Sequence, residues 1–302
     1  MELNQFQQRI ADNLSQIALR FDEPMSKHTS FRIGGPAAVM AFPQNEEELS
    51  EVLKVSGKLD IKPVILGAGT NVLAPDEGLP GLIVCLKDCM NGMELLEGGG
   101  IRVMSGVTMT RAAVFAANHG LTGMEFAHGI PGTVGGGVYM NAGAYGGEIS
   151  QICRSVTVMD RNGKTRQLSR EEMDFGYRHS ILEESGEIVV SAVFGLAQDS
   201  PEAVKARMRQ LQAKRSASQP LDLPSAGSAF KRPVGGYAAA LIDQAGLKGY
   251  RVGNAAISGK HAGFAVNLGG ATAHDVKELL TQVSDRVFAA SGIRLEPEIR
   301  IW

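Results

Sequence analysis

The sequence predicts an α+β protein of more than one domain. At 302 residues the chain is long enough for two domains, or three if they are small. Patterns typical of helices and of strands alternate along it, and the stretch 128–147 carries eight glycines with little that can pack a core. Because glycine loses much conformational freedom on folding, such a cluster indicates either backbone laid against a flat, largely apolar ligand or a mobile surface loop.

Charge and composition point to small-molecule partners. The formal net charge is -2 and the pI is near 6.3, so neither a basic nucleic-acid surface nor an acidic tail is indicated. Residues 1–6 lack a secretory signal, and no window reaches the ~20 apolar residues that cross a bilayer. Cys85, Cys89 and Cys153 are an odd number without histidines at ligand spacing, so we interpret them as packing residues and expect no metal site. These features predict a cytoplasmic protein without nucleic-acid or membrane partners.

The N-terminal part predicts a βαβ-like beginning. Apolar residues recur at spacings of three and four and predict a helix over 3–19. The run 27–38 breaks this period, and its glycines suit either a turn or a ligand before a strand at 39–42. Asn45 is placed to cap the next helix, and 63–66 reads as a buried strand.

That strand leads into a short glycine turn, Gly67-Ala68-Gly69-Thr70-Asn71. A dinucleotide fingerprint would need a third glycine at position 72 and a helix after it. Val72 stands there, and Pro75 and Pro80 forbid a regular helix before the strand at 82–85, so an ordinary Rossmann domain is excluded. The small polar residues and backbone N–H groups still suit a phosphate, so a phosphate cradle and a plain turn both remain open.

A second unit opens with a strand at 101–104. The helix that follows, 108–119, is expected to end at Gly120 as its C-cap. After the glycine stretch, 156–168 predicts a hairpin around the Asn-Gly turn, and Ser169 with Glu172 has the spacing of a capping box. Residues 188–194 predict a further strand.

A charged helix from Pro201 to about residue 216 places the main domain boundary near 200. The loop 224–233 has small residues and ends in two cations. Beyond it we expect a helix at 238–245, a strand at 263–267 and a helix at 273–290.

Five motifs in order resemble the UDP-N-acetylenolpyruvoylglucosamine reductase family, and the match runs from Lys27 nearly to the end. They are 67–71, 129–136, Tyr177-Arg178, 227–230 and 296–300. The resemblance implies a two-subdomain, non-Rossmann FAD-binding fold of the vanillyl-alcohol-oxidase-like superfamily, followed by an α+β substrate-binding domain. Accordingly, 1–200 would be the FAD-binding region, with subdomains at about 1–88 and 89–200, and 201–302 the substrate-binding domain.

The resemblance also implies the reaction. NADPH would reduce non-covalent FAD, leave, and be replaced by the enolpyruvyl ether of UDP-N-acetylglucosamine, whose vinyl methylene carbon receives the hydride. The product, UDP-N-acetylmuramate, serves peptidoglycan precursor synthesis. Matched to the family, the turn at 67–71 would hold the pyrophosphate and the glycine stretch the flavin. The cofactor residues implied are Gly67, Ala68, Gly69, Thr70, Asn71, Gly129, Ile130, Pro131, Gly132, Thr133, Gly135, Gly136 and Asn141.

Three residues match the family's catalytic positions. Hydride addition leaves negative charge spread into the substrate carboxylate, which the cation of Arg178 would stabilise. Ser228 would then give a proton to the adjacent carbon. Glu298 would polarise the developing enolate, as a neutral acid if its pKa is raised.

The segment after Pro233 lacks the insertion with which longer family members cover the sugar nucleotide, so the chain resembles the shorter type. For substrate contacts the candidates are Tyr177 for packing, and Arg232, Lys260 and His261 for the diphosphate. For Lys260 and His261 an ordinary solvated surface is an equal alternative. Two other functions stay open: a carbohydrate or alcohol oxidase of the same superfamily, and a non-catalytic flavin or nucleotide-binding module.

Overall fold

The computed structural model describes residues 3–302 and contains two compact units, each assembled from separate chain segments. The first unit comprises the chain up to 21 together with 39–68 and 81–214. The second comprises 22–38, 69–80 and 215–302. Two short N-terminal segments therefore fold with the C-terminal part of the chain.

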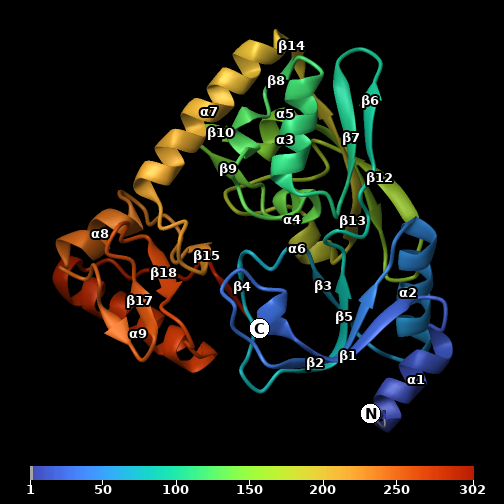
Figure 1. Cartoon of the computed structure of the whole chain (residues 1–302), viewed down its shortest axis with the longest axis horizontal. Coiled ribbons are helices and arrows are strands. Elements are labelled where there is room, and N and C mark those ends of the chain that lie inside the picture. The colour runs from blue at the N-terminus through green and yellow to red at the C-terminus, as the bar shows by residue number, and fades with distance from the viewer. Residues whose placement is uncertain (1–2) are drawn as a thin grey trace. The chain divides into compact units, whose positions relative to one another are not determined.

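A four-stranded sheet, made mainly from the first unit, runs in the order β1-β2-β5-β3 (Figure 1). Helices α1 and α2 pack on it, with Ile10, Leu49 and Leu82 fully buried between them. The α2 cap follows the sequence prediction, since the Asn45 side chain accepts from the Glu48 N–H at 2.8 Å. The bounds are α1 (Gln5–Asn13), β1 (Ala18–Pro24), η1 (Met25–Lys27), β2 (Pro36–Phe42), α2 (Glu46–Lys58), β3 (Val64–Leu66), β4 (Val72–Leu73) and β5 (Leu79–Cys85).

The predicted N-terminal helix is too long. Helix α1 ends at Asn13, and the last residues assigned to it lie in β1. Leu14 and Ile17 are buried as expected, but the Ile17 N–H donates to the Leu14 carbonyl in a turn. A turn also brings residues three apart to one side, so apolar spacing alone did not locate the end of the helix.

The larger sheet of the first unit is antiparallel, in the order β12-β11-β13-β7-β6. Helices α3 and α4 contribute to its core around Val134, Val156 and Phe194. Strand β6, the outer strand of a hairpin in Figure 1, was not predicted. The bounds are β6 (Met93–Leu96), β7 (Gly100–Met104), α3 (Met109–Asn118), β8 (Leu121–Thr122), η2 (Glu125–Ala127), α4 (Val134–Tyr139), β9 (Gly143–Ala144), β10 (Gly147–Glu148), α5 (Ile149–Ile152), β11 (Cys153–Met159), β12 (Thr165–Ser169), α6 (Leu182–Ser185), β13 (Ile188–Gly195), β14 (Ala197–Gln198) and α7 (Pro201–Ser218).

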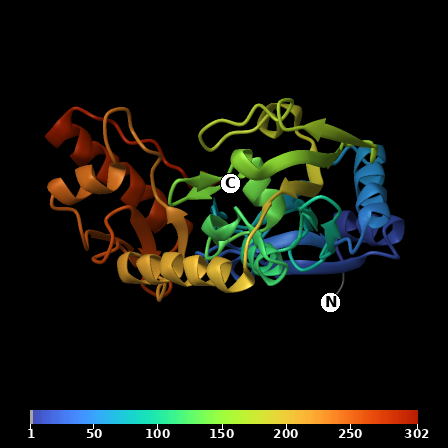
Figure 2. The same cartoon turned by 90° about the horizontal axis from the view of Figure 1, so that it is seen from above.

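The second unit contains a four-stranded antiparallel sheet in the order β15-β18-β17-β16. Helices α8 and α9 pack against each other and share its core (Figure 2). The last strand, β19, pairs in parallel with β4. The bounds are β15 (Ser225–Ser228), α8 (Ala238–Gln244), β16 (Arg251–Val252), β17 (Ala255–Ile257), β18 (Phe264–Asn267), α9 (Ala273–Ser291) and β19 (Arg300–Ile301).

The three cysteines are free thiols, and two of them are buried. Burial raises the pKa of Cys85 to about 11 and the pKa of Cys153 to about 12. Both therefore stay protonated at neutral pH, as expected of packing residues. Within residues 3–302, none of the helices has the length and apolar character needed to cross a bilayer.

Candidate functional site

The first part of the glycine turn contacts the glycine stretch within the first unit. A Cβ on Gly67 would lie 2.6 Å from Thr133 Oγ1, so only glycine allows this approach. Thr133 is 2% exposed and caps α4, where its Oγ1 accepts from the Gly136 N–H at 3.4 Å. The structure thus brings together two of the segments predicted to bind the cofactor.

The glycine stretch is not a surface loop over its middle part. Residues 134–139 form α4, and Val134 and Val138 are fully buried, so the expectation that little here packs a core is wrong. A Cβ on Gly137 would lie 2.7 Å from Met109 Sδ. Because its glycines have no side chains, this short helix can pack closely against the rest of the unit. Its backbone is also hydrogen-bonded to a neighbouring segment, since the Gly135 N–H donates to the Ser105 carbonyl at 2.9 Å.

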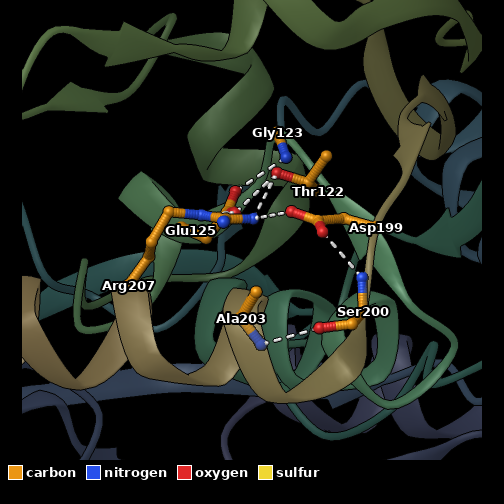
Figure 3. A network of polar contacts seen from close by, with 7 residues as sticks. All are labelled: Thr122, Gly123, Glu125, Asp199, Ser200, Ala203 and Arg207. Atoms are coloured by element: carbon orange, nitrogen blue, oxygen red, sulfur yellow. Dashed lines mark hydrogen bonds and ion pairs between the residues drawn. The ribbon is translucent and has the colours of Figure 1, made fainter.

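A polar network fixes the chain just before this stretch (Figure 3). Glu125 is 8% exposed, and its carboxylate accepts from Thr122 Oγ1 and the Gly123 N–H, each at 2.7 Å. Arg207 of α7 donates to Glu125 at 2.9 Å and to Asp199 at 2.6 Å. Burial alone would raise the pKa of Glu125, but the bonds from Thr122, Gly123 and Arg207 hold it below its ordinary value. This ion pair anchors α7 to the segment that leads into the glycine stretch.

Tyr177 and Arg178 form the tip of a two-residue turn. The N–H and carbonyl groups of Gly176 and His179 bond each other at 3.1 and 3.3 Å. Arg178 has φ 56, a left-handed conformation that costs an arginine energy, and its guanidinium carbon lies 5.0 Å from the centre of the Tyr177 ring. Tyr177 is 53% exposed, so the turn presents an aromatic ring and a cation together.

Asn141 connects the glycine stretch to this turn. Its side chain is 2% exposed, with Nδ2 donating to the Gly176 carbonyl at 3.0 Å and Oδ1 accepting from the Ser150 N–H at 2.9 Å. Its φ of 42 is also left-handed, which asparagine tolerates better than most residues. Both ends of the amide are therefore engaged within the protein.

Tyr145 is a candidate ligand-binding residue that the sequence did not predict. Tyr145 stands at the tip of the β9–β10 turn with φ 54 and is 45% exposed. An exposed aromatic residue held in a left-handed conformation is a candidate ligand contact. The available signal was a tyrosine directly before two glycines in a run of small residues.

In the second unit, the rest of the glycine turn contacts the segment 28–30. Gly69 has φ 60, and a Cβ there would lie 2.1 Å from the His28 carbonyl oxygen. Ser30 donates through its N–H to the Gly69 carbonyl at 3.0 Å and through its Oγ to the Ser225 carbonyl at 2.6 Å. Ser225 begins β15, the strand that ends at Ser228, so the turn and this strand are tied to one serine.

Ser228 and Glu298 lie on adjoining segments of the second unit. Ser228 is exposed, and the carbonyl of its neighbour Ala229 accepts from the Glu298 N–H at 2.9 Å. The Glu298 carbonyl in turn accepts from Asn71 Nδ2 at 3.2 Å, and the Arg300 N–H donates to the Asn71 carbonyl at 2.9 Å. These backbone contacts bring the segments of Ser228, Glu298 and Asn71 together, although Asn71 and Glu298 are 227 residues apart in the sequence.

The predicted diphosphate contacts have partners of their own. The guanidinium of Arg232 lies 4.5 Å from the centre of the Tyr237 ring, and Tyr237 is 62% exposed. Lys260 Nζ donates to the Ser216 carbonyl at 2.6 Å. His261 Nδ1 accepts from the Gly263 N–H at 3.1 Å, and burial lowers the pKa of its ring, so the neutral imidazole carries its proton on Nε2.

Comparisons with known proteins give a consistent picture. Residues 219–302 match the family described as UDP-N-acetylenolpyruvoylglucosamine reductase, C-terminal domain, and residues 36–169 match an FAD binding domain. The UDP-N-acetylenolpyruvoylglucosamine reductase of Streptococcus thermophilus is 43% identical over 97% of this chain and 95% of its own length. That of Streptococcus pneumoniae is 42% identical over 97% of both chains.

Solved structures agree. The UDP-N-acetylenolpyruvylglucosamine reductase of Thermus caldophilus superposes with a TM-score of 0.81 at 35% identity, covering 95% of this chain and 98% of that one. An alkyldihydroxyacetonephosphate synthase superposes at 0.50 and 16% identity over 66% of this chain and 45% of its own. The second likeness concerns the fold alone, the two-subdomain FAD-binding fold without a Rossmann motif that the sequence predicted.

Proposed function

Because the chain belongs to the UDP-N-acetylenolpyruvoylglucosamine reductase family, we propose that Arg178, Ser228 and Glu298 carry its reaction. The protein is an FAD- and NADPH-dependent oxidoreductase that converts the enolpyruvyl ether of UDP-N-acetylglucosamine to UDP-N-acetylmuramate for peptidoglycan synthesis. The observation that supports the residue assignment is the backbone hydrogen bond from the Glu298 N–H to the Ala229 carbonyl, which places Glu298 opposite the residue that follows Ser228. We further propose a cytoplasmic location, where NADPH and nucleotide sugars are available.

The residues present fit an FAD cofactor. Gly67 and Gly69 leave no room for a Cβ, so the turn presents bare backbone, and it carries no acidic side chain that would repel a pyrophosphate. We propose that 67–71 holds the pyrophosphate and that 129–133 with Gly135 and Gly136 supports the flavin. Asn141, predicted as a further cofactor residue, is buried with its amide bonded within the protein. When bound, FAD would supply the hydride transfer from NADPH to the vinyl methylene carbon of the substrate.

The chain's own residues manage the charge and the proton. Arg178 is held at a turn tip, where its cation stabilises the negative charge that spreads into the substrate carboxylate. Ser228 Oγ donates a proton to the carbon next to that carboxylate. Glu298 polarises the enolate that develops from the substrate carboxylate and this carbon. Tyr177 packs on the substrate, and Arg232, Lys260 and the Nε2–H of His261 offer donors to the diphosphate.

We also propose which parts of the chain bind the cofactor and which bind the substrate. Residues 1–200 would bind FAD, in subdomains of about 1–88 and 89–200, and 201–302 would bind substrate. The matches to an FAD binding domain at 36–169 and to a reductase C-terminal domain at 219–302 support it. The compact units follow a slightly different division, because 22–38 and 69–80 fold with the C-terminal part.

The substitution Ser228→Ala tests the proton donor. Rapid mixing without oxygen separates flavin reduction by NADPH from reoxidation by the enolpyruvyl sugar nucleotide. We expect an unchanged first half-reaction and a second one slowed by roughly 10²- to 10⁴-fold, the range of a general acid. Equal slowing of both half-reactions would show that Ser228 has another role.

A visible spectrum of the purified protein tests the overall assignment. The holoprotein should be yellow, lose its colour with NADPH, and regain it on addition of the enolpyruvyl sugar nucleotide. A colourless protein that takes up no added FAD would contradict it.

A further inference from the structure

Each unit contains an asparagine from a predicted cofactor segment that donates to the backbone of a proposed catalytic segment. In the first unit Asn141 Nδ2 bonds the Gly176 carbonyl at 3.0 Å, and in the second Asn71 Nδ2 bonds the Glu298 carbonyl at 3.2 Å. We propose that Asn71 and Asn141 are positioning residues, which aim Glu298 and Arg178 rather than contact the cofactor through their side chains. The inference rests on the proposed function only for the roles of those two targets.

At Glu298, peptide groups on both sides of the Cα are fixed. Its N–H donates to the Ala229 carbonyl at 2.9 Å, and its carbonyl accepts from Asn71. With both peptide planes held, the Cα–Cβ bond of Glu298 has a set direction, so only its side-chain torsions remain to be set when the carboxyl group meets the substrate. Replacing Asn71 by alanine would release only the peptide plane that contains the Glu298 carbonyl. The bond from the Arg300 N–H would remain, because it goes to the backbone carbonyl of residue 71, which any residue provides.

The turn that carries Arg178 is held in a similar way, here by the buried amide of Asn141. The Gly176 carbonyl accepts both from Asn141 Nδ2 and from the His179 N–H, so the peptide entering the turn cannot rotate. That peptide precedes Tyr177 and Arg178, and Arg178 sits in a strained left-handed conformation that needs a rigid frame. Asn141 is 2% exposed, and each polar end of its amide is bonded within the protein, which favours a positioning role over a contact with the cofactor.

The first test is Asn71→Ala, measured as two half-reactions in the FAD-loaded enzyme. We expect flavin reduction by NADPH within about twofold of wild type and reoxidation by substrate slowed by roughly 10-fold, as for the loss of one positioning hydrogen bond. The matched control is Glu296→Gln, an exposed residue of the same segment, which should change neither step. A variant that loses FAD affinity at least 10-fold and slows both steps equally would overturn the proposal, because the side chain would then serve the cofactor.

A double-mutant cycle separates this inference from the proposed function. If Asn71 acts through Glu298, Asn71→Ala should have no further effect on reoxidation once Glu298→Ala is present. Independent, multiplying effects would overturn the positioning role. If Glu298→Ala alone leaves reoxidation unchanged, it is the proposed role of Glu298 that fails.

For Asn141 the sharper variant is Asn141→Asp, which keeps an acceptor for the Ser150 N–H and sets a carboxylate oxygen against the Gly176 carbonyl in place of the donor. We expect a selective loss of about 10-fold in reoxidation, absent in the Arg178→Ala background.

Hydrogen exchange of the peptide 176–182 should become several-fold faster in the Asn141→Asp variant, and that of the peptide 296–302 should become faster only in the Asn71→Ala variant. If Asn141→Asp does not fold, Asn141→Gly keeps the left-handed backbone and serves the same comparison. Unchanged exchange in both segments would overturn the inference.

Discussion

The left-handed conformation of Arg178 makes a quantitative prediction about two substitutions at one position. Arg178→Ala and Arg178→Gly remove the same guanidinium and the same stack on Tyr177, which lies 5.0 Å away. They differ in that alanine keeps the cost of φ 56, about 1–2 kcal/mol for an L-residue, while glycine does not. Glycine loses about 0.5–1 kcal/mol more conformational entropy on folding, so from the midpoints of the two ranges the glycine variant should be more stable than the alanine variant by about 0.75 kcal/mol.

Thermal unfolding with the same saturating FAD measures this difference. For a unit of this size we expect the glycine variant to melt roughly 1–4 °C above the alanine variant. Both should lose substrate-driven reoxidation by a similar factor, roughly 10²- to 10³-fold, because one preorganised charge is missing from each. Equal melting temperatures would refute the strain at this turn, and full turnover in either variant would refute the charge-stabilising role of Arg178.

Three further predictions concern the frame around the site. Gly67→Ala should lower the melting temperature and FAD affinity, because its Cβ would meet a threonine oxygen at 2.6 Å, whereas Gly81→Ala, with open space around it, should change neither. Glu125→Gln should destabilise most at neutral pH, and the difference should shrink as the pH falls below 4.5, since a lowered folded-state pKa stabilises only above that range. Cys85 and Cys153 should react with a thiol reagent at pH 8 only after denaturant is added, because burial raises the pKa of both.

Local signals predicted much of the fold. Asn45 caps α2 as expected, and the Asn162-Gly163 turn closes the β11–β12 hairpin with Gly163 at φ 74. Ser169 and Glu172 make both bonds of a capping box, although the chain continues there as turns and not as a helix. Caps and turns depend on residues within a few positions of each other, which is why the sequence shows them.

The parts that were missed depend on distant residues. Helix α4 looked like a bare loop because its glycines are explained only by neighbours such as Met109 and Ser105, from another segment. The resemblance to the reductase family predicted Ser228 and Glu298 as catalytic residues, but not that Asn71 bonds Glu298 across 227 residues. No pattern in a single sequence encodes such a register.

The segment 69–80 shows how a stretch without regular helix can still form a rigid site. Ser30 and Asn71 tie one end of it to Ser225 and Glu298. At the other end, the Asp76 carboxylate accepts from the first two N–H groups of the long helix α9, at 2.8 and 3.2 Å. Leu73 and Ala74 between these anchors are fully buried. If 67–71 holds the pyrophosphate as proposed, a turn held in this way would lose little further entropy on binding, and the binding energy of the cofactor would not be spent on ordering its own loop.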